Sequence, residues 1–131
     1  MAKKDTAAKE TIALDTLYLV GDTDQSIALE VITGGINQTS TINVEIIGSQ
    51  IIAKGIQGNL PQTTIGSNKE LQGKILSVTC SIADTSRDTN YTELRIRLNG
   101  GILFMEYPLF ATVAEEGDSV NYVCVVRFFK P

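Results

Sequence analysis

The chain has 131 residues, of which 43% are hydrophobic, 6% are aromatic and 20% are charged. This length fits one folded domain with a sizeable core, and the composition excludes a disordered chain. The formal net charge of −4 argues against a nucleic-acid partner and against docking on an anionic membrane. We expect an N-terminal arm over residues 1–11 and a single domain over residues 12–131.

The first segment, MAKKDTAAKE, is polar and lacks the apolar core of a secretory signal peptide. No stretch of the sequence approaches the roughly 20 apolar residues that a membrane-spanning helix requires. We therefore expect synthesis in the cytoplasm, which is compatible with later incorporation into a particle. The arm is expected to be solvated in an isolated monomer and to dock on a neighbour in an assembly.

Alternation of apolar and polar residues predicts strands in the first half of the chain. Three segments follow a period of two, so that every second side chain faces the core: residues 12–20, 26–31 and 42–46. A shorter strand is expected over residues 50–54, because Gly48 and Gly55 indicate turns or bulges on either side of it.

The segment over residues 57–73 is rich in small polar residues and contains Pro61. This composition predicts a long loop with a short edge strand near residues 63–65. Loops of this length often carry a function or contact a partner. No helix is predicted here or elsewhere in the chain.

The second half carries the clearest period-two pattern, with strands predicted over residues 76–82, 92–99, 102–113 and 120–129. The sequence Asn99-Gly100-Gly101 predicts a hairpin between two of these strands. Pro108 indicates that the strand after this hairpin lies at a sheet edge or contains a bulge.

The last predicted strand is apolar on both of its faces. One face carries Val120, Tyr122, Cys124, Val126 and Phe128, and the other carries Val123, Val125 and Phe129. A strand of this kind is usually covered on both sides, here by a loop or by another subunit. Val123, Val125 and Phe129 are therefore our candidate interface residues.

Short strands at regular spacing, without a helix, predict an all-β fold. We expect an antiparallel β-sandwich of about eight strands, for which a jelly roll is one known arrangement. A closed barrel remains an alternative at this point, although the unequal strand lengths and long loops favour the sandwich.

The sequence contains no histidine, which removes most acid–base and nucleophilic catalysis near neutral pH. The cluster Glu115, Glu116 and Asp118 offers paired carboxylates, but it falls in a predicted turn where solvation explains it. No cofactor and no enzymatic activity are expected.

Calcium is the best candidate for a bound ion, because two predicted loops are rich in oxygen ligands. One loop contains Asp22 and Asp24, and the other contains Asp84, Asp88 and Asn90. Asp and Asn are also ordinary turn-forming residues, so the pattern has a simpler explanation as well.

Cys80 and Cys124 lie in the middle of predicted strands on otherwise apolar faces. They are expected to be reduced core thiols, with a disulfide across the sandwich as the alternative. Two cysteines are too few for a structural zinc site.

These observations favour a structural subunit that contacts copies of itself or other subunits of a larger particle. The loops are rich in amides and hydroxyls, which can form an interface without burying charge. The general composition resembles that of small β-sandwich proteins in phage particles and other protein shells. This resemblance concerns the fold and rests on no specific motif. The alternative is a module that binds carbohydrate or calcium through its loops.

Overall fold

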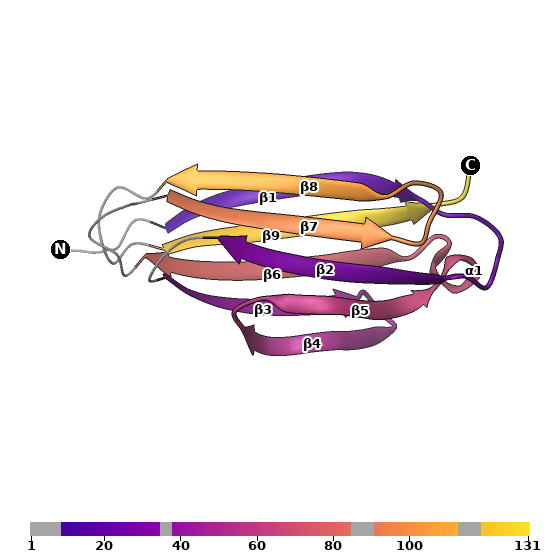
Figure 1. Cartoon of the computed structure of the whole chain (residues 1–131), viewed down its shortest axis with the longest axis horizontal. Coiled ribbons are helices and arrows are strands. Elements are labelled where there is room, and N and C mark those ends of the chain that lie inside the picture. Colours follow the sequence, from indigo (N-terminus) through magenta and orange to yellow (C-terminus); the bar gives the residue numbers. More distant parts are fainter. Residues whose placement is uncertain (1–8, 35–37, 85–90, 113–118) are drawn as a thin grey trace.

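The computed structural model describes residues 9–34, 38–84, 91–112 and 119–131, which form two packed β-sheets (Figure 1). One sheet contains β1 (Lys9–Leu19), β3 (Gln38–Ile46), β4 (Gln50–Gln57), β6 (Ile75–Asp84) and β9 (Ser119–Phe129). The other contains β2 (Ser26–Gly34), β5 (Leu60–Ser67), β7 (Tyr91–Asn99) and β8 (Met105–Thr112). A short helix, α1 (Asn68–Leu71), connects β5 to β6.

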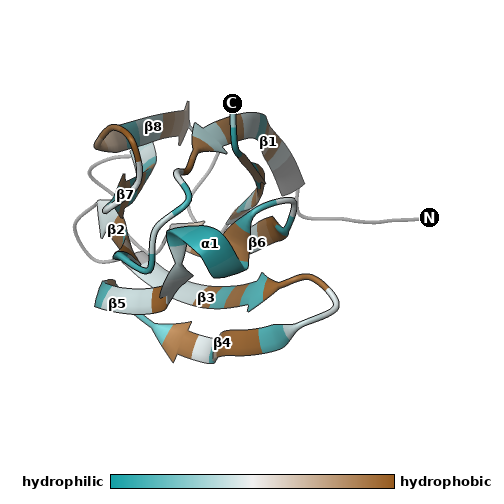
Figure 2. Ribbon diagram, turned by 90° about the vertical axis from the view of Figure 1, so that its right-hand side faces the viewer, coloured by the Kyte–Doolittle hydropathy of each residue, from teal (hydrophilic) through white to brown (hydrophobic). Residues whose placement is uncertain are grey.

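The strand order is β1-β9-β6-β3-β4 in the five-stranded sheet and β5-β2-β7-β8 in the four-stranded sheet. The β-sandwich is therefore confirmed, and Figure 2 shows its two layers from one end. In the described part of the chain there are nine strands, where about eight were expected. In the described part of the chain, no helix is long and apolar enough to cross a membrane.

The core lies between the sheets and follows from the predicted alternation. On β1, for example, Tyr18 is fully buried while its neighbour Leu17 is exposed. The Tyr18 ring meets the Phe128 ring edge-on, with 6.2 Å between the ring centroids. Each large apolar side chain buried in this way contributes about 1.5–3 kcal/mol to the folded state, before the entropy of ordering the chain is subtracted.

The first and last strands lie side by side and run parallel. The β1–β9 register is unbroken from Lys9 opposite Ser119 to Leu19 opposite Phe129. The other described strand pairs are antiparallel. This parallel pair and the ninth strand distinguish the sandwich from an ideal eight-stranded antiparallel jelly roll.

The prediction of a long loop over residues 57–73 is wrong, because most of this segment forms β5 and α1. The short edge strand predicted near residues 63–65 lies within β5, which is longer than predicted. Strand β5 tolerates Pro61 because it lies at the sheet edge, and its pairing with β2 shifts register twice. The helix begins with a capping box, in which Ser67 and Glu70 bond each other's backbone N–H.

Smaller differences concern where the strands begin and end. Gly48 lies in the turn before β4, as predicted, but β4 continues past Gly55 to Gln57. Gly55 has a φ of +64° and donates its N–H to Asn43 Oδ1 at 2.8 Å, where two residues of β4 face one residue of β3. This is the predicted bulge. Residues 102–104 belong to the connection between β7 and β8, and residues 9–11 of the expected arm lie in β1.

Candidate functional site

The outer face of the four-stranded sheet carries an ordered set of charges. Glu106 on β8 accepts hydrogen bonds from Arg95 at 3.0 Å and from Arg97 at 2.7 Å. Arg95 also contacts Glu93, and Arg97 reaches Glu30 on β2 at 3.5 Å. The bonds from Arg97 and Arg95 lower the pKa of the Glu106 and Glu93 carboxyl groups, respectively. These charges stay fixed at neutral pH and suit a solvated surface.

The outer face of the five-stranded sheet is different, because its central rows carry no charge. Thr41, Ser81 and Asn121 form one row, and Asn43, Thr79 and Val123 form the next. In the following row, Ser77 and Val125 lie between Glu45 on β3 and Asp15 on β1. We call the central residues the uncharged face: Thr41, Asn43, Ser77, Thr79, Ser81, Asn121, Val123 and Val125.

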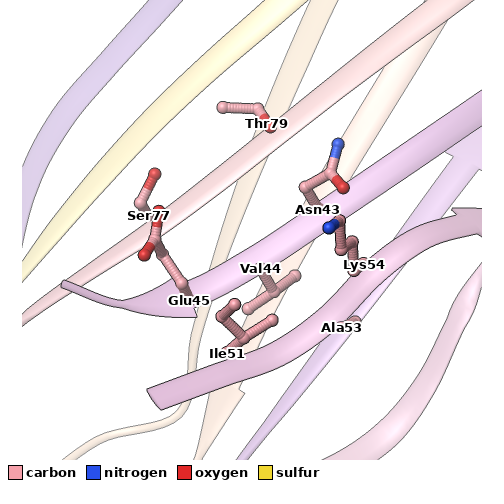
Figure 3. A pocket seen from close by; sticks show the side chains of 8 residues that line it. All are labelled: Asn43, Val44, Glu45, Ile51, Ala53, Lys54, Ser77 and Thr79. Carbon is pink, nitrogen blue, oxygen red and sulfur yellow. The ribbon is translucent and has the colours of Figure 1, made fainter. Parts of the chain in front are cut away.

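Two shallow hollows lie on the uncharged face and share Asn43 and Thr79. The first has a volume of about 210 Å³ and is drawn in Figure 3. Ser77 and Thr79 line it from β6, and Lys54 lines it from β4. The second measures about 310 Å³ and extends toward β9 and β1, where it reaches Asn121 and Val123.

The described side chains that line these hollows are mostly hydroxyls, amides and aliphatic groups. Among the described residues that line the first hollow, Glu45 is the only carboxylate and Lys54 the only cation, whereas a glycosidase needs two carboxylates. Among the described residues, neither hollow has an aromatic ring exposed on this face for stacking against a sugar. The cluster Glu115, Glu116 and Asp118 lies outside the described residues.

The candidate interface residues lie on the outer face of β9. Val123 is 39% exposed and Phe129 is 51% exposed, and Val125 is partly covered between them. Among the described elements, the four-stranded sheet covers the inner face of β9, and none packs over its outer face. Strand β9 thus combines a core face with an open apolar face. That a loop or another subunit covers the second face remains a prediction.

The described parts of the two calcium candidates lie at opposite ends of the sandwich. Asp22 and Asp24 are exposed in the loop after β1, beside the end where Leu19 faces Phe129. Asp84 ends β6 opposite Gln38, at the other end. The side chain of Asp84 lies outside the described residues, as do Asp88 and Asn90. Within the described part of the chain, no three His, Cys, Asp or Glu side chains form a metal-binding group.

The loop that contains Asp22 and Asp24 is held by an amide that sequence reasoning missed. Asn68 is buried at the start of α1 and bonds Gly21 N–H, Gln25 C=O and Gly100 C=O, each at 2.9 Å. The neutral side chain ties the connection between β1 and β2 to the connection between β7 and β8. Its sequence signal was the pattern Ser67-x-x-Glu70, which is a capping box at a helix start.

Both cysteines are free and buried, and they lie on neighbouring strands. Val78 faces Cys124, and Cys80 faces Tyr122, so both thiols belong to the five-stranded sheet. The alternative of a disulfide across the sandwich is therefore wrong. Burial raises the pKa of the Cys80 and Cys124 thiols to about 12, so neither supplies a thiolate nucleophile at neutral pH.

Comparisons of this chain with protein-family models, with curated proteins and with solved structures find no match. The function is therefore argued from the two faces of the sandwich and from its edges.

Proposed function

We propose that this protein is a non-enzymatic structural subunit that assembles with copies of itself in a larger particle. The observation that carries the proposal is the contrast between the two outer faces. The four-stranded sheet presents arginines and glutamates, while the centre of the five-stranded sheet presents hydroxyls, amides and valines.

Protein interfaces are depleted of charged residues at their centre and carry polar groups at their rim. The uncharged face has this arrangement. Asp15 pairs with Arg127 at 3.3 Å on the β1 side, and Glu45 and Lys54 lie on the β4 side. The serine, threonine and asparagine side chains of its centre can bond to a partner without burying a charge.

The absence of histidine from the sequence and the burial of both thiols favour a non-enzymatic role. A subunit of this kind needs a stable sandwich and specific surfaces. Both follow from the same alternation, which places one half of each strand in the core and the other half outside.

The test is the mass of the purified protein by light scattering over a concentration series, starting from the 14.2 kDa chain. Val123→Lys places a charge in the centre of the uncharged face, and Thr112→Lys places the same charge on the exposed end of β8. We expect Val123→Lys to reduce association by at least tenfold and Thr112→Lys to leave it unchanged.

Val123 is exposed, so both variants should keep the stability of the wild type within about 0.5 kcal/mol. Association that is equally strong in the wild type and in Val123→Lys would contradict the role proposed for this face. Unfolding of Val123→Lys would instead place Val123 in an intramolecular core.

A further inference from the structure

The two sheets have four outer edges, and three of them carry features that prevent pairing with another strand. Strand β4 has two register shifts, and β5 has two register shifts and Pro61. Strand β8 contains Pro108, which lacks an N–H group. Bulges and prolines of this kind protect edge strands, because they interrupt the row of free N–H and C=O groups.

Strand β1 is the fourth edge and lacks both features. Its 11 residues, KETIALDTLYL, include no glycine and no proline. Its ladder with β9 has no register shift. The charge in its middle, Asp15, is paired with Arg127 of β9 on the outer face and does not block the edge.

The free groups of β1 can be assigned from its hydrogen bonds. In a parallel ladder, alternate residues of a strand bond to the neighbouring strand, and the others point away from it. Val20 donates its N–H to Phe129 C=O on β9, while the carbonyls of Leu17 and Leu19 accept bonds from Tyr107 and Ile102 on the opposite side. Odd-numbered residues of β1 therefore point outward.

The outward groups fall into two parts. At Leu17 and Leu19, the molecule itself covers the edge with the Tyr107 hydroxyl at 3.1 Å and the Ile102 N–H at 3.0 Å. At Thr11, Ala13 and Asp15, the same alternation directs backbone N–H and C=O groups to the open side. This stretch can accept another strand.

Apolar side chains accompany this free edge. Ile12 and Leu14 on β1 are only partly buried against the core, as are Leu109 and Ala111 on β8. The two strands lie on the same side of the sandwich (Figure 1). Leu103, in the connection between β7 and β8, is 61% exposed and lines a hollow with Leu17 and Leu19 near the end of β1. A strand added to β1 would cover apolar surface as well as backbone groups.

We propose that β1 pairs in antiparallel orientation with β1 of a second copy, so that two five-stranded sheets join into one continuous sheet. This inference deepens the proposed function, since it names the partner and a second contact of the subunit. A two-fold contact closes as a pair, so an assembly that grows beyond the β1 pair needs a second contact, here the uncharged face.

The side chains of β1 favour a register centred on Ala13. Ala13 then faces Ala13 of the partner subunit without a steric clash, and Ile12 faces Leu14 of the partner subunit on the core side. Thr11 faces Asp15 of the partner subunit, so that its hydroxyl can donate to the carboxylate. Each favourable pair occurs twice because of the two-fold symmetry.

Other registers are poorer. Moving the centre one residue toward the C-terminus sets Ile12 against Thr16 of the partner subunit. A centre on Asp15 sets two carboxylates against each other. The self-complementary pattern is the reason for choosing a second copy as the partner.

The first experiment is disulfide trapping with Ala13→Cys in mild oxidant. Directly opposed residues of a hydrogen-bonded antiparallel pair have Cα atoms about 5.5 Å apart, which a disulfide spans. The native thiols are buried and protonated, so they do not compete. We expect Ala13→Cys to form a covalent dimer.

The matched control is Asp15→Cys on the same edge. In the register centred on Ala13, two Asp15 residues are four positions out of register, which corresponds to about 13 Å along a strand. We expect no covalent dimer from Asp15→Cys alone. When the Asp15→Cys protein is mixed with the Thr11→Cys protein, we expect a covalent dimer that contains one copy of each. The inference would be overturned if Ala13→Cys, and the mixture of Asp15→Cys with Thr11→Cys, gave no more covalent dimer than Asp15→Cys alone.

The second experiment measures association of Ala13→Pro, which removes an outward N–H that the ladder with β9 does not use. Thr112→Pro is its control, because Thr112 lies in the same alternate set as Pro108 on the β8 edge. Far-UV circular dichroism confirms that both variants are folded. We expect Ala13→Pro to weaken association at least tenfold and Thr112→Pro to leave it unchanged.

Combining Ala13→Pro with Val123→Lys separates this inference from the proposed function. We expect each single variant to stop at a smaller oligomer than the wild type and the double variant to be monomeric. If Ala13→Pro associates like the wild type while Val123→Lys does not, the edge inference is wrong and the role of the face stands. The reverse result refutes the role of the face and supports the edge.

Discussion

A hydrogen bond joins the two sheets through the core and gives a sharp test of the fold. Tyr122 on β9 and Thr92 on β7 are both fully buried, and their hydroxyl oxygens lie 2.7 Å apart. The Thr92 hydroxyl also donates to Ala111 C=O at 2.9 Å. A threonine hydroxyl has one proton, so Tyr122 must be the donor in the bond between the sheets.

The two ends of this bond should tolerate substitution unequally. Tyr122→Phe removes the donor but leaves the Thr92 hydroxyl bonded to Ala111, and we expect a loss of about 1 kcal/mol. Thr92→Val keeps the side-chain shape, but it leaves the Tyr122 hydroxyl and one lone pair of Ala111 C=O without their partner. A buried polar group without a partner costs about 1–3 kcal/mol, so Thr92→Val should cost about 2–3 kcal/mol.

Urea unfolding at one fixed protein concentration measures both losses, because association would otherwise shift the midpoint. The double variant Thr92→Val/Tyr122→Phe no longer buries an unpaired hydroxyl at position 122. We expect it to be more stable than the sum of the single losses predicts, by about 1 kcal/mol. Equal single losses that add without coupling would refute the assigned direction of the bond.

Three further predictions concern the strand connections and the core thiols. Gly100→Ala places a Cβ 2.1 Å from Ser26 C=O at a φ of +102°, and urea unfolding should show a loss above about 3 kcal/mol. Asn68→Ala removes three hydrogen bonds and should cost about 2–4 kcal/mol, with faster amide exchange at Gly21 as its signature. The pKa of Cys80 and of Cys124 is raised to about 12 in the fold, so the unfolded chain loses these protons first. The contribution of these thiols to stability should be constant below about pH 8 and fall as the pH rises above about 9. Urea midpoints across this range check it, and an unchanged slope in Cys80→Ala would contradict the assignment.

The period-two pattern predicted the sandwich because the strand face that packs on the core must carry apolar side chains, and these recur at every second residue. On β9 the alternation from Val120 to Phe128 placed every core residue correctly. Pro108 indicated an edge strand because proline has no N–H to donate to a second neighbouring strand, and β8 is an edge strand. Gly55 indicated a bulge, and in the structure the bulge is stabilised by the hydrogen bond from Gly55 N–H to Asn43 Oδ1.

The sequence indicated only a short edge strand near residues 63–65 in place of the full β5, and it did not show α1, because their stability comes from contacts made in the fold. Strand β5 is held by β2, and its small polar residues resemble a loop when taken alone. Asn68 resembled one more loop amide, because its partners Gly21, Gln25 and Gly100 are distant in sequence. Strand order was equally hidden, so the exposed edge of β1 could not be predicted.

The pairing of the first described strand with the last has a consequence for the order of folding. Asp15 and Arg127, which meet across this pair, are 112 positions apart in the chain. Strand β1 has no partner in its sheet until β9 has been synthesised, and β6 lacks one of its two neighbours until the same moment. Topologies with such distant contacts fold slowly, and strands that wait for a partner are prone to aggregate. The synthesis of β9 is therefore the step at which the nascent chain can close its larger sheet.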